Sequence, residues 1–367
     1  MQSAKTNTNS LWSLLAPLRG DFMMTNNRGM QLGIYALLIS MTLGAGNAIS
    51  KNIIKSKKVG VEHTGKNVRH DFPYESKFVQ VNGSKIHFVD TGGEGDPVLM
   101  IHGQPTWSYL WRNVIPKLEG QHRVIAVDLI GFGKSDKPDI KYTIEDHAAY
   151  LKGFIEALEL RNLTLVIHDW GGFLGFDYAA KNPERIKALA FMETVIPSKT
   201  PTVGGSGQKP EEMKGFAKIL ANLSTPGVGE KMIYEDNMFI EQLMPGSMIK
   251  KLSEDQMNAY RAPFAKGKNR LPMLQFPREV GILGNASEYV LESRKSFAEY
   301  LSSTDVPALL LTFSPGALVN KEKVDWVKNN MKNASVKHIG QAIHYVQEEH
   351  PEAIGNSIAE WMTVHKL

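Results

Sequence analysis

The fold is decided by the stretch Leu165-Val166-Ile167-His168-Asp169-Trp170-Gly171-Gly172. Its apolar first half predicts a strand buried on both faces, and its two glycines predict a tight turn into a helix. This strand–turn–helix arrangement is typical of a nucleophile elbow, which exposes the turn residue at the carboxyl end of a sheet. Serine is the usual residue there, whereas this chain has Asp169. A carboxylate needs no activating base and can attack carbon directly, leaving an ester that water must cleave.

Apolar runs on either side of this stretch predict a mostly parallel sheet. The runs at 97–101, 124–127, 163–167, 188–192 and 308–312 are continuous, as strands covered by helices on both faces should be. Before them, 77–81 and 85–89 alternate polar and apolar residues across Asn82-Gly83-Ser84, which predicts an edge hairpin. Thr143 and Asp146 form a capping box for a crossover helix. We therefore predict an α/β fold with an eight-stranded, mostly parallel sheet and helices on both faces.

The alternation of strands and helices also predicts the domain boundaries. It stops after Ile196 and resumes near Val306, so residues 197–305 are expected to form an inserted helical cap. Residues 76–196 and 306–367 are then the core, and 49–75 are an N-terminal linker. The cap is rich in Met, which suits core gaps or an adaptable pocket wall. Phe239 and Pro263 are its candidate pocket residues.

The first 48 residues differ from the rest. Asp21 is their only acidic residue, and an apolar run from Met30 to Ala45 is too short for a membrane span. We expect a signal peptide at 1–48 that is cleaved after Ala48. Met23 or Met24 is a possible start, because the segment before the run is unusually long. Cleavage would place the protein in the periplasm or outside the cell; an uncleaved anchor or a tail is the alternative, and without a signal the protein is cytoplasmic.

Charge and cysteine content exclude several classes of function. The 42 Lys and Arg residues exceed the 38 Asp and Glu residues by only four, without a long basic run, so nucleic acid is not an expected partner. With no cysteine, the chain has no disulfide, no thiolate nucleophile and no Cys-ligated metal.

Cleaving an ester on Asp169 requires a general base, for which His344 is the candidate. It lies in Gln341-Ala342-Ile343-His344-Tyr345 after the last predicted strand, which gives the chain order nucleophile, acid, histidine. Glu193 ends the strand at 188–192, next to the elbow strand, and is the candidate acid that orients the imidazole. A structural role is expected for His102 and His168.

Donors for an anion are expected in the loop His102-Gly103-Gln104-Pro105-Thr106-Trp107 and at the elbow. The backbone N–H groups of Gln104 and Trp170 are placed to form an oxyanion hole. Their side chains carry amide and indole N–H donors, which suit a departing anion in a dry pocket. The alternative is that Trp170 only packs and Gln104 only supplies turn polarity.

From about Phe72 onward the chain resembles the haloalkane dehalogenases of the α/β-hydrolase superfamily. The segments that carry the resemblance are His102-Gly103-Gln104-Pro105-Thr106, Ser108-Tyr109-Leu110-Trp111-Arg112-Asn113, Asp128-Leu129-Ile130-Gly131-Phe132-Gly133-Lys134-Ser135-Asp136-Lys137-Pro138, the elbow, Phe191-Met192-Glu193, Tyr260-Arg261-Ala262-Pro263-Phe264 and Ile343-His344-Tyr345-Val346-Gln347-Glu348. The resemblance implies that Asp169 is the nucleophile, His344 the base, Glu193 the acid and Trp170 a halide donor, as in the subfamily with an Asp-His-Glu triad.

The chain departs from the family at Gln104, where the second halide donor is usually Asn. Glutamine keeps the amide but is longer by one methylene, about 1.5 Å. The implied reaction has Asp169 displace halide from a saturated carbon and His344 activate water to cleave the ester. It needs a small halogenated hydrocarbon and water, and no metal or organic cofactor.

Three alternatives remain at this stage. An epoxide hydrolase uses the same triad, but it usually protonates the ring oxygen with two cap tyrosines, for which Tyr234, Tyr260, Tyr289 and Tyr300 are candidates. A coelenterazine luciferase resembles the dehalogenases in the same segments. A ligand-binding module with a degenerate site is disfavoured because every triad position is filled.

Overall fold

The computed structural model describes residues 60–64, 71–197, 213–265, 267–281, 284 and 286–367. The expected signal peptide lies outside these residues, as does most of the expected linker. None of the helices in this part of the chain is long and apolar enough to cross a membrane.

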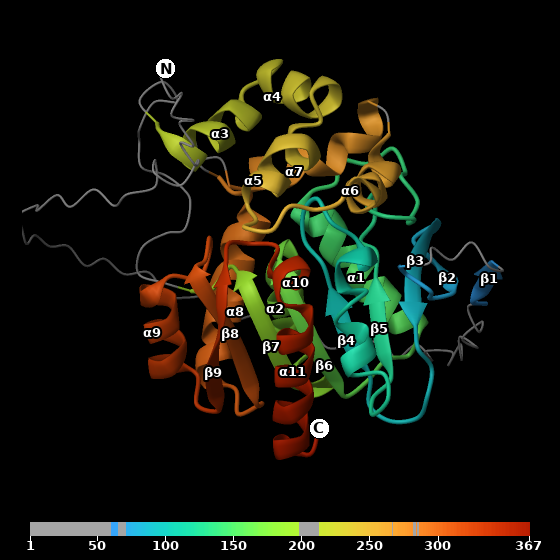
Figure 1. Cartoon of the computed structure of the whole chain (residues 1–367), viewed down its shortest axis with the longest axis vertical. Coiled ribbons are helices and arrows are strands. Elements are labelled where there is room, and N and C mark those ends of the chain that lie inside the picture. The colour runs from blue at the N-terminus through green and yellow to red at the C-terminus, as the bar shows by residue number, and fades with distance from the viewer. Residues whose placement is uncertain (1–59, 65–70, 198–212, 266, 282–283, 285) are drawn as a thin grey trace, which may run out of the picture.

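A single twisted sheet forms the centre of the molecule (Figure 1). Its strands lie in the order β1-β2-β3-β5-β4-β6-β7-β8-β9. The pairs from β5 to β9 are parallel, and β1, β2 and β3 join by antiparallel pairing at one edge. The strand bounds are β1 (Glu62–Thr64), β2 (Ser76–Val81), β3 (Ser84–Asp90), β4 (Val98–Ile101), β5 (Val124–Val127), β6 (Leu163–Asp169), β7 (Ile186–Thr194), β8 (Ala308–Pro315) and β9 (Ala334–Ala342).

The predicted α/β architecture is confirmed, with one addition to the sheet. Strands β2 to β9 make up the eight expected, and the three residues of β1 add a ninth at the antiparallel edge. This strand lies in the range expected to be a linker, where Phe72 is also buried. A strand of three residues, Glu62-His63-Thr64, is too short to show an apolar pattern in the sequence.

Helices cover both faces of the sheet. On one face α1, α2 and α8 pack against one another, whereas α11 contacts β8 and β9. Thr143 caps α1 through the predicted capping box with Asp146. The core helices are η2 (Ser108–Trp111), η3 (Ile115–Lys117), α1 (Ile144–Ala157), α2 (Trp170–Lys181), η4 (Pro183–Arg185), α8 (Glu288–Ser303), α9 (Lys321–Asn330), α10 (Val346–Glu349) and α11 (Pro351–His365).

The cap lies over the carboxyl ends of the parallel strands (Figure 1). It consists of α3 (Gly215–Ser224), α4 (Val228–Glu230), η6 (Lys231–Glu235), η7 (Phe239–Leu243), α5 (Met244–Gly246), α6 (Glu254–Arg261), η8 (Ala262–Phe264), η9 (Gly267–Arg270) and α7 (Leu271–Glu279). The expected cap range also included α8, but that helix packs on α2 of the core, where Phe297 contacts the rings of Phe173 and Phe176. The apolar face of α8 therefore completes the helical layer on the sheet.

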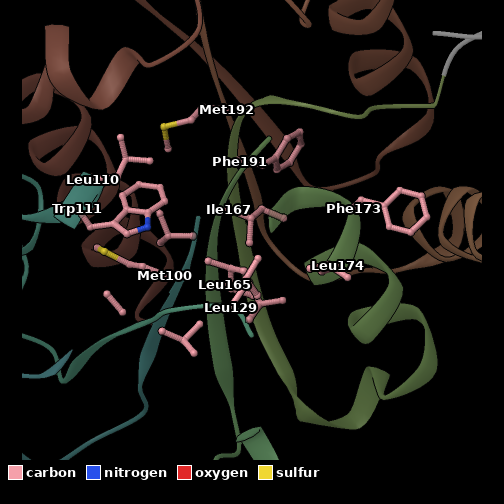
Figure 2. Packing of buried hydrophobic residues seen from close by; sticks show 14 of the residues in the cluster. Met100, Leu110, Trp111, Leu129, Leu165, Ile167, Phe173, Leu174, Phe191 and Met192 are labelled. Carbon is pink, nitrogen blue, oxygen red and sulfur yellow. The ribbon is translucent and has the colours of Figure 1, made fainter. Parts of the chain in front are cut away.

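The hydrophobic core extends to both sides of the central strands. Figure 2 shows Leu110 and Trp111 on one side of β6, with Phe173 and Leu174 on the other. Leu165, in β6 itself, is fully buried between them. A strand buried on both faces is held rigidly, and so is the residue at its end.

Candidate active site

Asp169 stands at the turn between β6 and α2. Its backbone has φ +53° and ψ −127°, in a region that favours glycine, so the surrounding structure must hold it there. The hydroxyl of Thr194 donates to its carbonyl oxygen over 2.7 Å. Gly172 is required at this point, because a Cβ there would overlap the Thr194 hydroxyl. The elbow predicted from the sequence is therefore present.

Two backbone N–H groups hold the carboxylate of Asp169. The N–H of Gln104 donates to Oδ1 over 2.8 Å, and the N–H of Trp170 also donates to this carboxylate. Gly103 allows the close approach of the loop, since a Cβ at that position would overlap Oδ1. Both backbone groups expected in the oxyanion hole thus lie next to the nucleophile candidate.

His344 lies between two carboxylates. Its Nε2 is 3.3 Å from Asp169 Oδ2, and its Nδ1 is 3.5 Å from Glu193 Oε2, which are ion-pair contacts slightly longer than an ordinary hydrogen bond. The carbonyl oxygen of His344 is 2.8 Å from Nε2 of His168, in the structural role expected for that residue. The structure therefore brings together three side chains that are up to 175 positions apart in the sequence.

Glu193 is held by the backbone that follows β8. Its side chain is fully buried, and Oε2 accepts the N–H groups of Ala317 and Leu318, both over 2.8 Å. The N–H of Val319 donates to Oε1 over 3.4 Å. With φ at +41°, Glu193 is a second strained residue in the site. Its carboxylate is fixed, so it can fix the imidazole in turn.

The two carboxylates set the protonation of His344. Burial alone would lower the pKa of this imidazole, but its contacts with Asp169 and Glu193 raise the pKa to about 9. Burial would raise the pKa of Asp169, but His344 and the Trp170 N–H hold it below its usual value. At neutral pH the resting site therefore contains an Asp169 carboxylate beside a protonated His344.

A cavity of about 240 Å³ lies above Asp169, between the core and the cap. Most of its wall is apolar. It is lined by Gln104, Asp169, Trp170, Phe173, Val195, Phe216, Ile219, Leu220, Phe239, Leu243, Gly246, Ser247, Pro277, Val280, Val290, Arg294, Ala317, Leu318, His344 and Tyr345. A concave site with few polar groups suits a small apolar molecule.

The two cap residues expected in the pocket have different positions. Phe239 belongs to η7 and lines the cavity. Pro263 belongs to η8 and is not among the lining residues. Its neighbour Phe264 turns inward instead and packs against Phe132, with ring centroids 5.7 Å apart. Pro263 is therefore corrected to a half-buried residue of the cap that does not line the cavity.

Trp170 presents its indole to the cavity. The ring is stacked on Phe276 of α7, with centroids 5.0 Å apart and planes 13° apart. Stacking against a cap residue fixes the orientation of the indole N–H, which is a donor only.

The side chain of Gln104 has a role that was not predicted. Its Nε2 donates to the carbonyl oxygen of Met273 in α7 over 2.8 Å, while its Oε1 is buried and accepts no hydrogen bond within the described residues. The extra methylene lets the amide reach the cap backbone. One of its two N–H bonds is therefore already occupied, and the halide-binding role expected for Gln104 depends on the other.

Polar contacts around the site tie the cap to the core. Besides the Gln104 bond, Nε1 of Trp107 donates to the Ala259 carbonyl over 3.2 Å, and the N–H of His344 donates to the Ser247 carbonyl over 3.1 Å. The loop that carries His344 is thus in direct contact with the cap.

A buried ion pair adds to this link. Arg112 donates two hydrogen bonds to Glu348, of 2.5 and 2.7 Å, and the hydroxyl of Tyr260 in α6 also donates to Glu348. All three side chains are buried. The sequence motifs contain these residues, but nothing in them indicated that they meet.

Arg294 of α8 is a cavity residue that the sequence analysis missed. Its neighbours Ser293 and Lys295 form no motif, and only the four-residue spacing from Val290 places it on the inner face of the helix. That face could be recognised only once the packing of α8 was known.

The cap tyrosines named for an epoxide hydrolase do not line the cavity. Tyr260 bonds to Glu348, and the hydroxyl of Tyr289 donates to Asp177 over 2.8 Å. Neither Tyr234 nor Tyr300 is among the lining residues. Tyr345 does line the cavity, but its hydroxyl donates to the Gln104 carbonyl over 3.1 Å. Within the described residues, the cavity therefore lacks a pair of tyrosine donors.

Comparison with known proteins identifies the relatives of the chain. Residues 96–223 match the family model described as the alpha/beta hydrolase fold. A haloalkane dehalogenase of Mesorhizobium japonicum is 40% identical over 284 residues, which cover 77% of this chain and 90% of that protein. One of Bradyrhizobium diazoefficiens is 39% identical over 292 residues, covering 78% and 94%.

Solved structures agree with these relatives. A haloalkane dehalogenase from Agrobacterium tumefaciens superposes with a TM-score of 0.73 at 35% identity, covering 81% of this chain and 99% of that one. The similarity thus extends over the core and the cap.

Proposed function

The chain belongs to the haloalkane dehalogenase family, hydrolases that act on carbon–halogen bonds, and we propose that Asp169, His344 and Glu193 are its catalytic triad. The observation that carries the assignment is His344, placed between the two carboxylates at 3.3 and 3.5 Å beside an apolar cavity. The substrate is a small haloalkane, and the second reactant is water.

In the first step, an oxygen of Asp169 attacks the carbon that bears the halogen. A C–O bond forms, the carbon–halogen bond breaks, and the electron pair leaves with the halide. The indole N–H of Trp170 donates to the departing anion. Since the Gln104 amide has two N–H bonds and Met273 accepts one, we assign the other to the halide.

In the second step, water cleaves the ester. Esterification removes the negative charge of Asp169, so the pKa of His344 falls and its proton leaves for the solvent. The neutral imidazole, oriented by Glu193, then takes a proton from water while the oxygen attacks the ester carbonyl. The N–H groups of Gln104 and Trp170 donate to the resulting oxyanion. Collapse releases the alcohol and restores the ion pair, with one proton and one halide produced per turnover.

The test is halide release by the purified protein from 1-bromobutane and 1,2-dibromoethane. Asp169→Asn is expected to abolish release. His344→Phe is expected to accumulate the ester, seen as a mass increase equal to the alkyl group. Release that persists in Asp169→Asn, or a His344→Phe protein without the adduct, would contradict the assignment. No release by folded wild-type protein would direct the next assays to epoxides and coelenterazine.

We also propose that residues 1–48 direct export and are removed. The apolar run from Met30 to Ala45, followed by small residues, supports this. N-terminal sequencing of protein from the periplasm of an expressing cell is expected to begin at Ile49, the residue after Ala48. An intact N-terminus on cytoplasmic protein would contradict the proposal.

A further inference from the structure

Arg294 places a guanidinium on the wall of the same cavity that contains Asp169. It lies one helical turn after Val290 on α8, so both side chains point from one face of the helix into the cavity. The wall on the Asp169 side consists of apolar residues such as Phe173 and Val195. The lining of the cavity therefore combines a nucleophile, a cation and many apolar side chains, and Arg294 also borders a second cavity beside Val195 and Ile196.

Within the described residues, Arg294 has no hydrogen-bond or ion-pair partner, although it is half-buried. The other partly buried arginines all donate to a carboxylate or a carbonyl; they are Arg112, Arg123, Arg185, Arg261, Arg270 and Arg278. Guanidinium keeps its charge in proteins, so an unpaired one against an apolar wall is costly unless an anion joins it.

The charged groups nearby, among the residues that the structure describes, do not supply that anion. Lys323 is buried, and Arg294 repels its charge. Glu193 accepts three backbone N–H groups and faces His344, while Asp169 is paired with the same imidazole. Among the lining residues, the cations are thus Arg294 and His344, and the one carboxylate, that of Asp169, is already paired with His344. An anionic group on the ligand would supply the missing partner of Arg294.

We propose that the cavity binds haloalkanes with a carboxylate at the end opposite the halogen, and that Arg294 binds this carboxylate. The inference rests on the proposed function, since the halogenated carbon must reach Asp169. The planar fork of guanidinium matches a carboxylate through two parallel hydrogen bonds. The methylene chain of an ω-halocarboxylate then lies along the apolar wall. The bonds formed and broken are those of the reaction above, and the product is an ω-hydroxycarboxylate and halide.

The experiment compares 6-bromohexanoate with 1-bromohexane, which has the same chain length without the anion. Bromide release gives kcat/KM for wild type, Arg294→Met, Arg294→Lys and the control Lys328→Met, which removes one exposed positive charge from α9. Arg294→Met is expected to lower kcat/KM for the carboxylate about 10- to 100-fold, the range of a charge-assisted hydrogen bond, and that for 1-bromohexane less than about threefold. Arg294→Lys is expected to restore part of the loss, and Lys328→Met to change neither value.

If Arg294→Met lowered kcat/KM equally for both substrates, the proposal would be overturned. Arg294 would then have a structural role or a role in the exit of the halide. Wild type that hydrolyses 1-bromohexane but not bromocarboxylates of four to eight carbons would overturn it too. If neither substrate reacts, the proposed function fails, and hexanoate binding, measured by isothermal titration, decides the inference separately. Binding that disappears in Arg294→Met supports an anion site, whereas absent or unchanged binding refutes it.

Discussion

Replacing Asp169 by Asn is expected to lower the pKa of His344 sharply. Asparagine has nearly the shape of aspartate but no charge, so it imitates the charge state of the ester intermediate. The variant therefore isolates the event that turns His344 from a protonated partner of the nucleophile into a base. The imidazole can be followed without turnover, because the first step is blocked.

The size of the change follows from the site geometry. The pKa of His344 rises from 6.5 to about 9 although burial opposes the rise. Asp169 lies 3.3 Å from Nε2 and Glu193 lies 3.5 Å from Nδ1, so at an effective dielectric constant of about 20 each attraction is about 5 kcal/mol and the two are nearly equal. Asp169 thus supplies about half of the joint effect, and without it the pKa of His344 should be about 7.7 or lower.

The assay is an NMR titration of the histidine ring protons in the two proteins. The His344 signal is assigned by its loss in His344→Gln and in Asp169→Asn/His344→Gln. Ring signals of the surface histidines serve as the internal control and should titrate alike in both proteins. A pKa of His344 that stays near 9 in Asp169→Asn would refute the reasoning, because Glu193 alone would then hold the proton and ester formation would not release it.

Three further changes test the packing around the site, each by urea unfolding. Glu348→Ala leaves Arg112 buried without its partner, so the free energy of unfolding should fall by about 3–5 kcal/mol. The control is Glu352→Ala, which removes the 76% exposed carboxylate of a surface ion pair and should lower the free energy of unfolding by less than about 1 kcal/mol. Similar losses in the two variants would contradict the role of Glu348 as the buried partner of Arg112. His147 is buried, and neither of its ring nitrogens has a hydrogen-bond partner among the described residues. Burial lowers the pKa of His147 to about 3, so its neutral form stabilises the protein above pH 6.5, and this stability is lost as the pH falls. Between pH 8 and pH 5, the fall in the free energy of unfolding should be about 2 kcal/mol smaller in His147→Phe than in the wild type. An equal fall in both proteins would show that His147 is protonated in the folded state. Gln104→Asn shortens the side chain by about 1.5 Å and should lower the free energy of unfolding by about 1 kcal/mol, because the bond to the cap carbonyl is lost; no loss would mean that this bond contributes little.

The central sheet and the triad candidates could be predicted because their signals are local. A strand such as β6 is a continuous apolar run, and Asp169 follows it directly before two glycines. Glu193 is the last residue but one of β7, the strand next to β6, so parallel pairing alone brings it to the edge where Asp169 stands. The positions of these two carboxylates can therefore be predicted without knowing how the side chains pack.

The remaining features depend on contacts between distant parts of the chain. Gln104 and Met273 are 169 residues apart, and only the docked cap shows that the amide is occupied. The orientation of α8 decides that Arg294 faces the cavity, and the same packing places this helix in the core. Pro263 differs from Phe264 by one position, and one position in a 3-10 helix such as η8 turns a side chain by about 120°.

The polar contacts between the cap and the core have a consequence for substrate traffic. Lifting the cap as a rigid lid would break the bonds of Gln104 to Met273, Trp107 to Ala259 and Tyr260 to Glu348 together, at about 1 kcal/mol or more each. It would also pull on the loop of His344, through its bond to Ser247, and displace the base. Passage of haloalkane and alcohol through the cavity wall by side-chain rotation would leave all of these bonds in place, so the catalytic groups would stay assembled during exchange.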